Sequence, residues 1–193
     1  MVLIRSLQAV YAATIDRSKF REIASRVVVF AVPLFYWGRE RQWWGLGVVI
    51  AGVLIRTWGA GYLQKDKTMA AQGPYLLVRH PLYLGSCLLA AGLVIAINHW
   101  TAVLIIGGVT FITYWHTIRH EEKNLLARFG TSYATYRREV GPLWPKRKGL
   151  KKFVRSLRSD GIGFSFKQYM KNKEYECLAG AAVVLLVMYL GSP

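Results

Sequence analysis

The sequence predicts an all-α bundle of about five membrane-spanning helices, preceded by a short helix in the membrane interface. Its 193 residues are 53% hydrophobic and have a mean hydropathy of +0.25. Several apolar runs approach the roughly 20 residues that a helix needs to cross a bilayer. Seven Trp and eleven Tyr add side chains that favour the headgroup level of a membrane. This combination disfavours a water-soluble globule.

The N-terminal segment, residues 1–22, is predicted to form an amphipathic helix that lies in the interface. Leu3, Leu7 and Val10 recur at helical spacing, as residues on one helix face do. Arg5 interrupts the run, so the segment lacks the clean apolar core of a signal peptide.

Five apolar segments follow, and we expect each of them to form a membrane helix. Only Asn98-His99 separates the third from the fourth, and so short a turn predicts an antiparallel helical hairpin. The fifth is short for a span. We therefore expect one of three arrangements: it begins earlier, near Tyr169, it crosses with little tilt, or it is re-entrant. The segments cover residues 20–37, 42–63, 82–97, 100–118 and 177–190.

The distribution of basic residues indicates the topology. The stretches 1–26, 64–80 and 119–175 carry five, three and fifteen basic residues, whereas the 38–41 loop carries two and the 98–99 turn none. Because basic loops stay in the cytoplasm, we predict an integral multi-pass protein with a cytoplasmic N-terminus. The net charge of +16 is typical of nucleic-acid binding or of contact with anionic membranes, and the apolar runs favour the membrane.

We divide the chain into the interfacial helix (1–22), a membrane core (23–145) and a C-terminal part (146–193) that joins a basic segment to the last apolar run. The basic segment, Lys146–Lys173, is either a solvated anchor or a surface that gathers anionic lipid. The oligomeric state is not readable, because glycine-rich helix faces serve intramolecular packing as readily as dimerisation.

Two polar motifs adjoin the apolar segments, where charged side chains are costly to keep without a function. The first places an arginine and a histidine at the start of the third apolar helix. Free N–H groups and the helix dipole favour an anion such as a carboxylate there. This motif is the run Gly73-Pro74-Tyr75-Leu76-Leu77-Val78-Arg79-His80-Pro81-Leu82-Tyr83-Leu84-Gly85.

The second motif begins where the fourth apolar helix leaves the membrane. Carboxylates at a helix C-terminus oppose its dipole, so we expect one of the paired glutamates to hold a cationic or hydroxyl-bearing ligand. The predicted topology places both motifs on the cytoplasmic face. The second motif comprises Glu121-Glu122, Phe129-Gly130, Tyr133, Tyr136, Arg137 and Pro145.

Other polar residues give weaker signals. Arg56 lies inside the second apolar segment and is expected to face the bundle interior or a wet cavity. His116 and His120 have the i, i+4 spacing of a metal clamp, but the chain has only four histidines, so we predict no metal site.

Together the two motifs resemble the signature of the isoprenylcysteine carboxyl methyltransferase and phospholipid methyltransferase superfamily. The resemblance covers about residues 42–145, and it implies an integral membrane enzyme that uses S-adenosylmethionine at the cytosolic membrane edge. It assigns catalysis to Arg79, Glu122 and Arg137. Arg79 is expected to pair with a substrate carboxylate, with Arg137 or Arg138 as the alternative for that role. It assigns cofactor binding to Gly73, Tyr75, His80, Tyr83, Glu121 and Glu122.

The implied acceptor is a small lipophilic molecule with a polar end. We prefer a prenylcysteine-like carboxylate, with an amine, thiol or hydroxyl as open alternatives. Two other classes stay open: an NADPH-dependent membrane reductase of the sterol reductase type, which has a similar RHxxY loop, and a non-catalytic basic membrane scaffold. Glu121-Glu122 disfavours the reductase, which typically has a more basic stretch there, and the RHPxY spacing disfavours the scaffold.

Overall fold

The computed structural model describes residues 42, 44–63, 69–159 and 163–190. Within these ranges the structure consists of helices and turns, with one isolated parallel β-bridge between Val78 and Gly141. This agrees with the predicted all-α class. The predicted interfacial helix and the first apolar segment, 20–37, lie outside the described residues.

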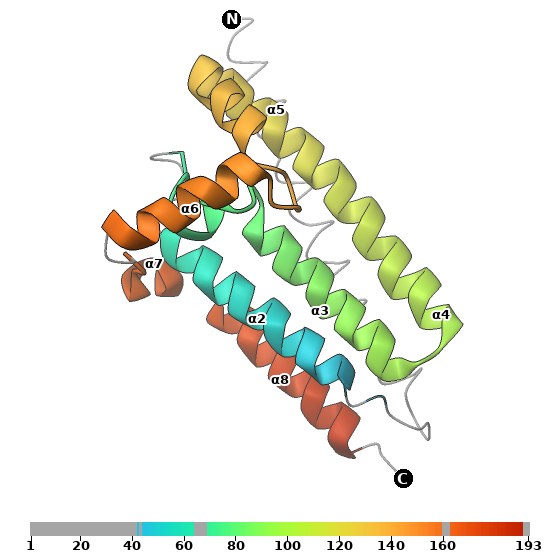
Figure 1. Cartoon of the computed structure of the whole chain (residues 1–193). Helices are drawn as coiled ribbons and strands as arrows, with labels where there is room; N and C mark the ends of the chain where they lie inside the picture. The colour runs from blue at the N-terminus through green and yellow to red at the C-terminus, as the bar shows by residue number, and fades with distance from the viewer. Residues whose placement is uncertain (1–41, 43, 64–68, 160–162, 191–193) are drawn as a thin grey trace, which may run out of the picture.

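Three helices pack side by side in the order α8, α2 and α3, and a rod formed by α4, η2 and α5 lies beyond α3 (Figure 1). A shorter helix, α6, crosses one end of this array. The elements are α2 (Trp44–Tyr62), η1 (Gly73–Leu76), α3 (Pro81–Ile97), α4 (Trp100–Ala102), η2 (Val103–Gly107), α5 (Gly108–Glu139), α6 (Arg147–Ser159), α7 (Phe166–Lys171) and α8 (Tyr175–Leu190).

Two of the described helices are long and apolar enough to cross a membrane, Trp44–Tyr62 and Trp100–Glu139. The helices α3 and α8 are also apolar but contain 17 and 16 residues. These four helices match the second to fifth predicted segments. The count of five membrane helices remains a prediction, because its first member lies outside the described residues.

The turn between α3 and α4 forms the predicted hairpin. Asn98 ends α3 in the left-handed conformation, with φ of 49°, and its N–H bonds to the carbonyls of the preceding turn. The His99 imidazole then caps α4 by accepting from the Thr101 N–H at 3.3 Å. A left-handed C-cap followed at once by an N-cap reverses the chain within two residues.

Small residues allow α2 and α3 to approach closely. A Cβ on Gly52 would lie 2.7 Å from the Gly85 carbonyl oxygen, so a larger residue would push the helices apart. Close approach at small residues is typical of packed membrane helices. At this position the glycine-rich face of α2 therefore serves packing within the chain. The adjoining core joins α2, α3, α4, η2 and α8 through Val49, Ala90, Leu93, Ala96, Ile97, Ala102, Ile106, Val184 and Met188.

The C-terminal helices are fixed to α2 by polar contacts. The Arg56 guanidinium bonds to both carboxylate oxygens of Glu174, at 2.8 to 3.0 Å, to the Leu82 carbonyl at 3.2 Å and to the Ser86 hydroxyl. The Asn172 amide donates two bonds of 2.9 Å to carbonyls at the end of α2. Arg56 thus faces the bundle interior, as predicted.

The last apolar helix begins later than one of our alternatives proposed. Lys173 follows α7 with φ of 56°, a conformation that ends a helix. As a result α8 begins at Tyr175, and the alternative start near Tyr169 is wrong.

Candidate active site

The first motif forms a tight loop before α3. Gly73 has φ of +53°, and a Cβ on it would lie 2.6 Å from the Tyr62 ring, so a side chain there would be both strained and obstructed. Pro74 is the second residue of the short helix η1, and Tyr75, which follows it, is buried. Further on, Pro81 is the first residue of α3 and His80 is its N-cap, in agreement with the predicted position.

The second motif folds back onto this loop. The rod breaks at Gly130, with φ of 51° and ψ of −124°, and the chain after it doubles back toward the loop (Figure 1). The Arg79 N–H then bonds to the Gly141 carbonyl at 2.8 Å, and the His80 N–H to the Pro142 carbonyl at 3.1 Å. Two motifs about 60 residues apart therefore meet at one end of the bundle.

A buried tyrosine ties the two motifs together. The Tyr136 hydroxyl donates a 2.7 Å hydrogen bond to the Tyr75 carbonyl. We expect Tyr136→Phe to lower the free energy of unfolding by about 1–3 kcal/mol, because the buried carbonyl loses its partner. Denaturation of the detergent-solubilised protein would measure this. Tyr175→Phe, at the exposed first residue of α8, is the control, and equal losses of unfolding free energy in the two variants would contradict this role of Tyr136.

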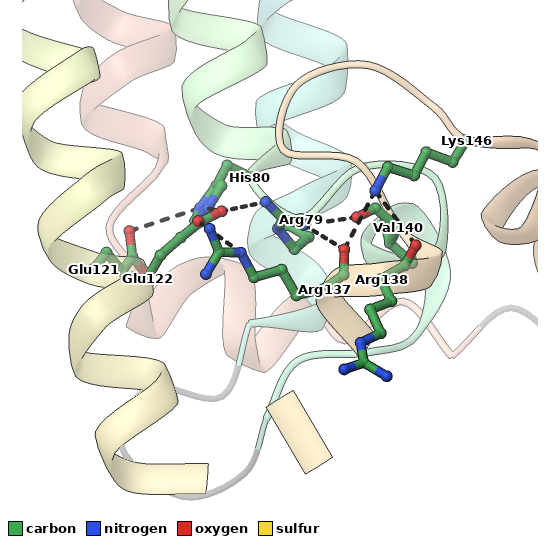
Figure 2. Close-up of polar contacts among 8 residues, drawn as sticks. All are labelled: Arg79, His80, Glu121, Glu122, Arg137, Arg138, Val140 and Lys146. Atoms are coloured by element: carbon green, nitrogen blue, oxygen red, sulfur yellow. Dashed lines mark hydrogen bonds and ion pairs between the residues drawn. The ribbon is translucent and has the colours of Figure 1, made fainter. Parts of the chain in front are cut away.

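Arg79 holds the two motifs at their centre. Its side chain is 6% exposed, and its terminal nitrogens donate to the Glu122 carboxylate and, at 2.8 Å each, to the carbonyls of Arg137 and Val140. Figure 2 shows these bonds converging on the guanidinium. The protein itself therefore occupies the terminal donors that the sequence assigned to a substrate carboxylate.

Glu122 is the anionic partner of three side chains. Besides Arg79, its carboxylate oxygens lie 3.4 Å from His80 Nε2 and 3.5 Å from Arg137 Nε. Glu121 lies one residue earlier on α5, with its Oε2 3.8 Å from His80 Nδ1 (Figure 2). Direct contacts thus link five predicted site residues from three parts of the chain: Arg79, His80, Glu121, Glu122 and Arg137.

The environment keeps Glu122 ionised. Burial by itself would raise the pKa of this carboxyl, but the contact with His80 and the hydrogen bond and charge of Arg79 outweigh burial and lower the pKa to about 2. The group lies beyond the apolar part of its helix, which ends near Ile118. A group with a lowered pKa in the folded state stabilises that state once it is ionised.

This shift predicts a pH dependence. The stabilisation from ionised Glu122 is complete above the usual pKa of 4.5 and is lost as the pH falls toward the folded value of about 2. The difference in unfolding free energy between the wild type and Glu122→Gln should therefore shrink between about pH 5 and about pH 2.5. A constant difference over that range would contradict the ion pair.

Several polar atoms of this cluster are buried and have no hydrogen-bond partner among the described residues. They are Arg79 Nε, His80 Nε2, Glu121 Oε2 and the Tyr133 hydroxyl. Burial and the nearby Glu122 charge raise the pKa of Tyr133 to about 12, so its hydroxyl remains a neutral donor. Buried polar atoms without partners are rare in native proteins and often indicate a ligand or water that is not described.

An aromatic series leads from this cluster between α3 and α5. The Tyr83 ring lies 5.6 Å from the His80 ring and 5.3 Å from the Tyr114 ring, centre to centre. Tyr83 and His80 are therefore adjacent, as the assignment of both to one cofactor site requires. Gly73 and Tyr75 lie earlier in the same loop, where Tyr75 is buried and its carbonyl accepts the hydrogen bond from Tyr136.

Some residues of the site were not predicted from the sequence. The carbonyls of Val140, Gly141 and Pro142 fix the loop, yet backbone groups leave no trace in residue type. The Lys146 ammonium lies 3.4 and 3.3 Å from the last carbonyls of α5; a basic residue after a helix end is a usable signal for this role. Arg138, the predicted alternative to Arg137 as a partner of the substrate carboxylate, points away from the cluster (Figure 2).

Part of the chain is similar in sequence to known proteins. Residues 41–132 match the model of a family described as phospholipid methyltransferase. The resemblance to this methyltransferase superfamily is confirmed. The match includes the loop with Arg79 and His80 and the Glu121-Glu122 pair, and it ends before Tyr133. The elements α6, α7 and α8 lie outside it.

Two curated proteins are similar to part of the chain. A stretch of 76 residues is 33% identical to the protein-S-isoprenylcysteine O-methyltransferase of Schizosaccharomyces pombe, covering 39% of this chain and 32% of that protein. A stretch of 103 residues is 33% identical to the cobalt-zinc-cadmium resistance protein CzcN of Cupriavidus metallidurans, covering 52% and 47%. The chain thus spans about a third to a half of these relatives' lengths. No solved structure matches it significantly.

Proposed function

We propose that the protein transfers the methyl group of S-adenosylmethionine to a small lipophilic acceptor at the cytoplasmic edge of a membrane. The observation that carries the proposal is the union of the two motifs around Glu122, in which buried polar atoms of His80, Glu121 and Tyr133 make no hydrogen bond to the described part of the chain. The match to the phospholipid methyltransferase family supports it. We retain the prediction of five membrane helices with a cytoplasmic N-terminus.

The residues present fit this cofactor. S-adenosylmethionine supplies an electrophilic methyl group on a sulfonium, and it also carries an amine, a carboxylate and ribose hydroxyls. The buried Glu121 Oε2 is an acceptor for the amine or a ribose hydroxyl, and the Tyr133 hydroxyl is a donor for an anionic group. His80 Nε2 donates or accepts according to its tautomer. Gly73, Tyr75 and Tyr83 would complete the cofactor contacts.

The geometry distinguishes the roles of the two arginines. Arg79 is buried and holds Glu122, so we assign it a positioning role. The Arg137 side chain is 52% exposed and lies 3.5 Å from Glu122, so it can reach a ligand at the edge of the cluster. We therefore assign recognition of the acceptor carboxylate to Arg137.

The state of Glu122 favours a carboxylate acceptor. With a pKa of about 2 and a buried arginine partner, it is a weak general base at neutral pH. An amine acceptor must lose a proton before or during transfer, whereas a carboxylate is already ionised and needs alignment alone. Among the acceptors considered, we therefore propose a prenylcysteine-like carboxylate first.

Incorporation of radiolabelled methyl groups would test this function. The purified protein would be given labelled S-adenosylmethionine with an S-prenylated cysteine, a phosphatidylethanolamine or an alkyl thiol. We expect label in the prenylcysteine as a base-labile ester. Label in the lipid amine alone would overturn the choice of acceptor, and label in none of the three would count against methyl transfer.

The neighbouring arginine offers a matched control for the role of Arg137. We expect Arg137→Ala to raise the KM for a carboxylate acceptor by about 10-fold or more, since a charge-assisted contact contributes about 1.5–3 kcal/mol, with a smaller change in kcat. Arg138→Ala removes the same charge from a side chain that points away (Figure 2) and should leave KM unchanged. Equal effects would contradict the assignment.

A further inference from the structure

The helix α6 has an unusual combination of features outside the candidate site. It covers Arg147–Ser159, carries no acidic residue, and lies beyond the segment that matches the methyltransferase family. Apolar side chains recur at i, i+3, i+4 and i+7, which places them on one face of the helix. These are Leu150, Phe153, Val154 and Leu157; Lys148 precedes them, and Lys151, Lys152 and Arg155 lie between them.

The protein covers only part of this apolar face. The Phe153 ring packs edge-on against Trp58 of α2, with ring centres 5.7 Å apart. The other three members, Leu150, Val154 and Leu157, are 48%, 45% and 48% exposed. Three neighbouring apolar side chains on a strongly basic helix are therefore left about half exposed by the described part of the chain.

The orientation of α6 places this face at the boundary of the apolar bundle. In Figure 1 the helix crosses the end of the array, transverse to α2 and α3. The partner of Phe153 is Trp58, in the last turns of an apolar helix, and tryptophan favours the headgroup level. A helix that lies across the ends of membrane helices lies in the plane of the interface.

Several contacts fix α6 in this position. A Cβ on Gly149 would lie 2.5 Å from the Leu76 carbonyl oxygen of η1, so the two backbones touch. Lys152 forms an ion pair with Glu139 at the end of α5. The helix is thus attached directly to the loop that leads to Arg79 and His80.

We propose that α6 is an in-plane anchor that binds the anionic lipid surface of the protein's own membrane. Leu150, Val154 and Leu157 enter the boundary between headgroups and acyl chains, and the basic side chains on either side of them meet lipid phosphates. Nucleic acid would require the basic side chains but not the apolar stripe. Because α6 touches η1, the lipid surface also supports the loop of the candidate site from the cytoplasmic side.

Lipid selectivity would test the charge half of the proposal. The full chain would be reconstituted in phosphatidylcholine bilayers with spin-labelled phosphatidylglycerol or phosphatidylcholine, and the fraction of each lipid immobilised by the protein would be compared. We expect at least about threefold selectivity for the anionic lipid, lost in about 1 M salt because charges at a surface are screened. Equal immobilisation of the two lipids would overturn the proposal.

Two triple variants separate α6 from the general charge of the protein. Lys148→Gln, Lys151→Gln and Arg155→Gln together should remove most of the selectivity. Lys123→Gln, Arg128→Gln and Lys167→Gln remove the same charge from exposed positions on α5 and α7 and should retain it. Equal losses in the two variants would mean a diffuse charge effect and would contradict a site on α6.

The depth of the apolar face is an independent measurement. In a background with Cys87→Ala and Cys177→Ser, a spin label would be attached at Val154→Cys or Lys151→Cys. We expect the label at 154 to be more accessible to oxygen than to a water-soluble nickel complex, and the label at 151 to show the reverse. If both labels contact water equally, the face lies outside the membrane, and a protein partner replaces lipid as its occupant.

Discussion

Replacing Glu174 with leucine is expected to lower the free energy of unfolding by about 3–5 kcal/mol, because it leaves Arg56 as an unpaired charge between packed helices. The two side chains are 18% and 11% exposed, and they join α2 to the segment that precedes α8. Thermal or denaturant unfolding in detergent micelles would measure the loss. Glu176→Leu, at an exposed neighbouring position, should cost far less.

The double variant makes this prediction sharper. Arg56→Met combined with Glu174→Leu removes both charges, and apolar replacement of a buried pair is often neutral. We therefore expect the double variant to recover most of the stability that Glu174→Leu loses. The loss of unfolding free energy in the double variant would be compared with the sum of the losses in Arg56→Met and Glu174→Leu. If the two are equal, the ion pair does not couple these residues.

Replacing Glu122 with glutamine is expected to reduce methyl transfer by about 100-fold or more. The amide has lost the charge that holds Arg79, His80 and Arg137 together, and a displacement of about 1 Å at a reacting centre can reduce the rate by about that factor. The measurement is kcat/KM for labelled methyl transfer, together with the unfolding midpoint of the same preparation.

A second glutamate of the same helix is the control for this loss. Glu139 pairs with the exposed Lys152 at the other end of the doubled-back segment, and Glu139→Gln should keep nearly full activity. Comparable losses of activity in the two variants, with the fold intact, would remove Glu122 from the site. If Glu122→Gln unfolds while Glu139→Gln does not, activity would be measured in Glu122→Asp, which keeps the charge and should retain the fold.

Hydrophobic patterning placed the apolar helices that lie within the described residues. The 98–99 turn was found where the sequence predicted it, and α3 begins at Pro81, one residue before the predicted segment. The start of the last helix was harder to predict, because it depends on the left-handed conformation of Lys173. A lysine is not a residue type that indicates such a turn.

The sequence also identified the residues that cluster, but not how they divide their roles. Arg79 was expected to meet a ligand, and its terminal donors instead hold Glu122 and two carbonyls. That outcome depends on the chain reversal at Gly130, which brings Val140 to the guanidinium. Likewise no local feature of the sequence identifies Glu174 as a buried ion-pair partner, since Arg56 lies 118 residues away.

Calorimetric titration of the detergent-purified protein with S-adenosylmethionine, S-adenosylhomocysteine and NADPH tests the central claim most directly. We predict saturable binding of the first two ligands, no binding of NADPH, and weaker binding to a folded His80→Ala variant. Binding of NADPH alone would place the protein with the membrane reductases. Binding of none of the three, with and without a prenylated cysteine present, would contradict the methyltransferase account and favour a non-catalytic scaffold.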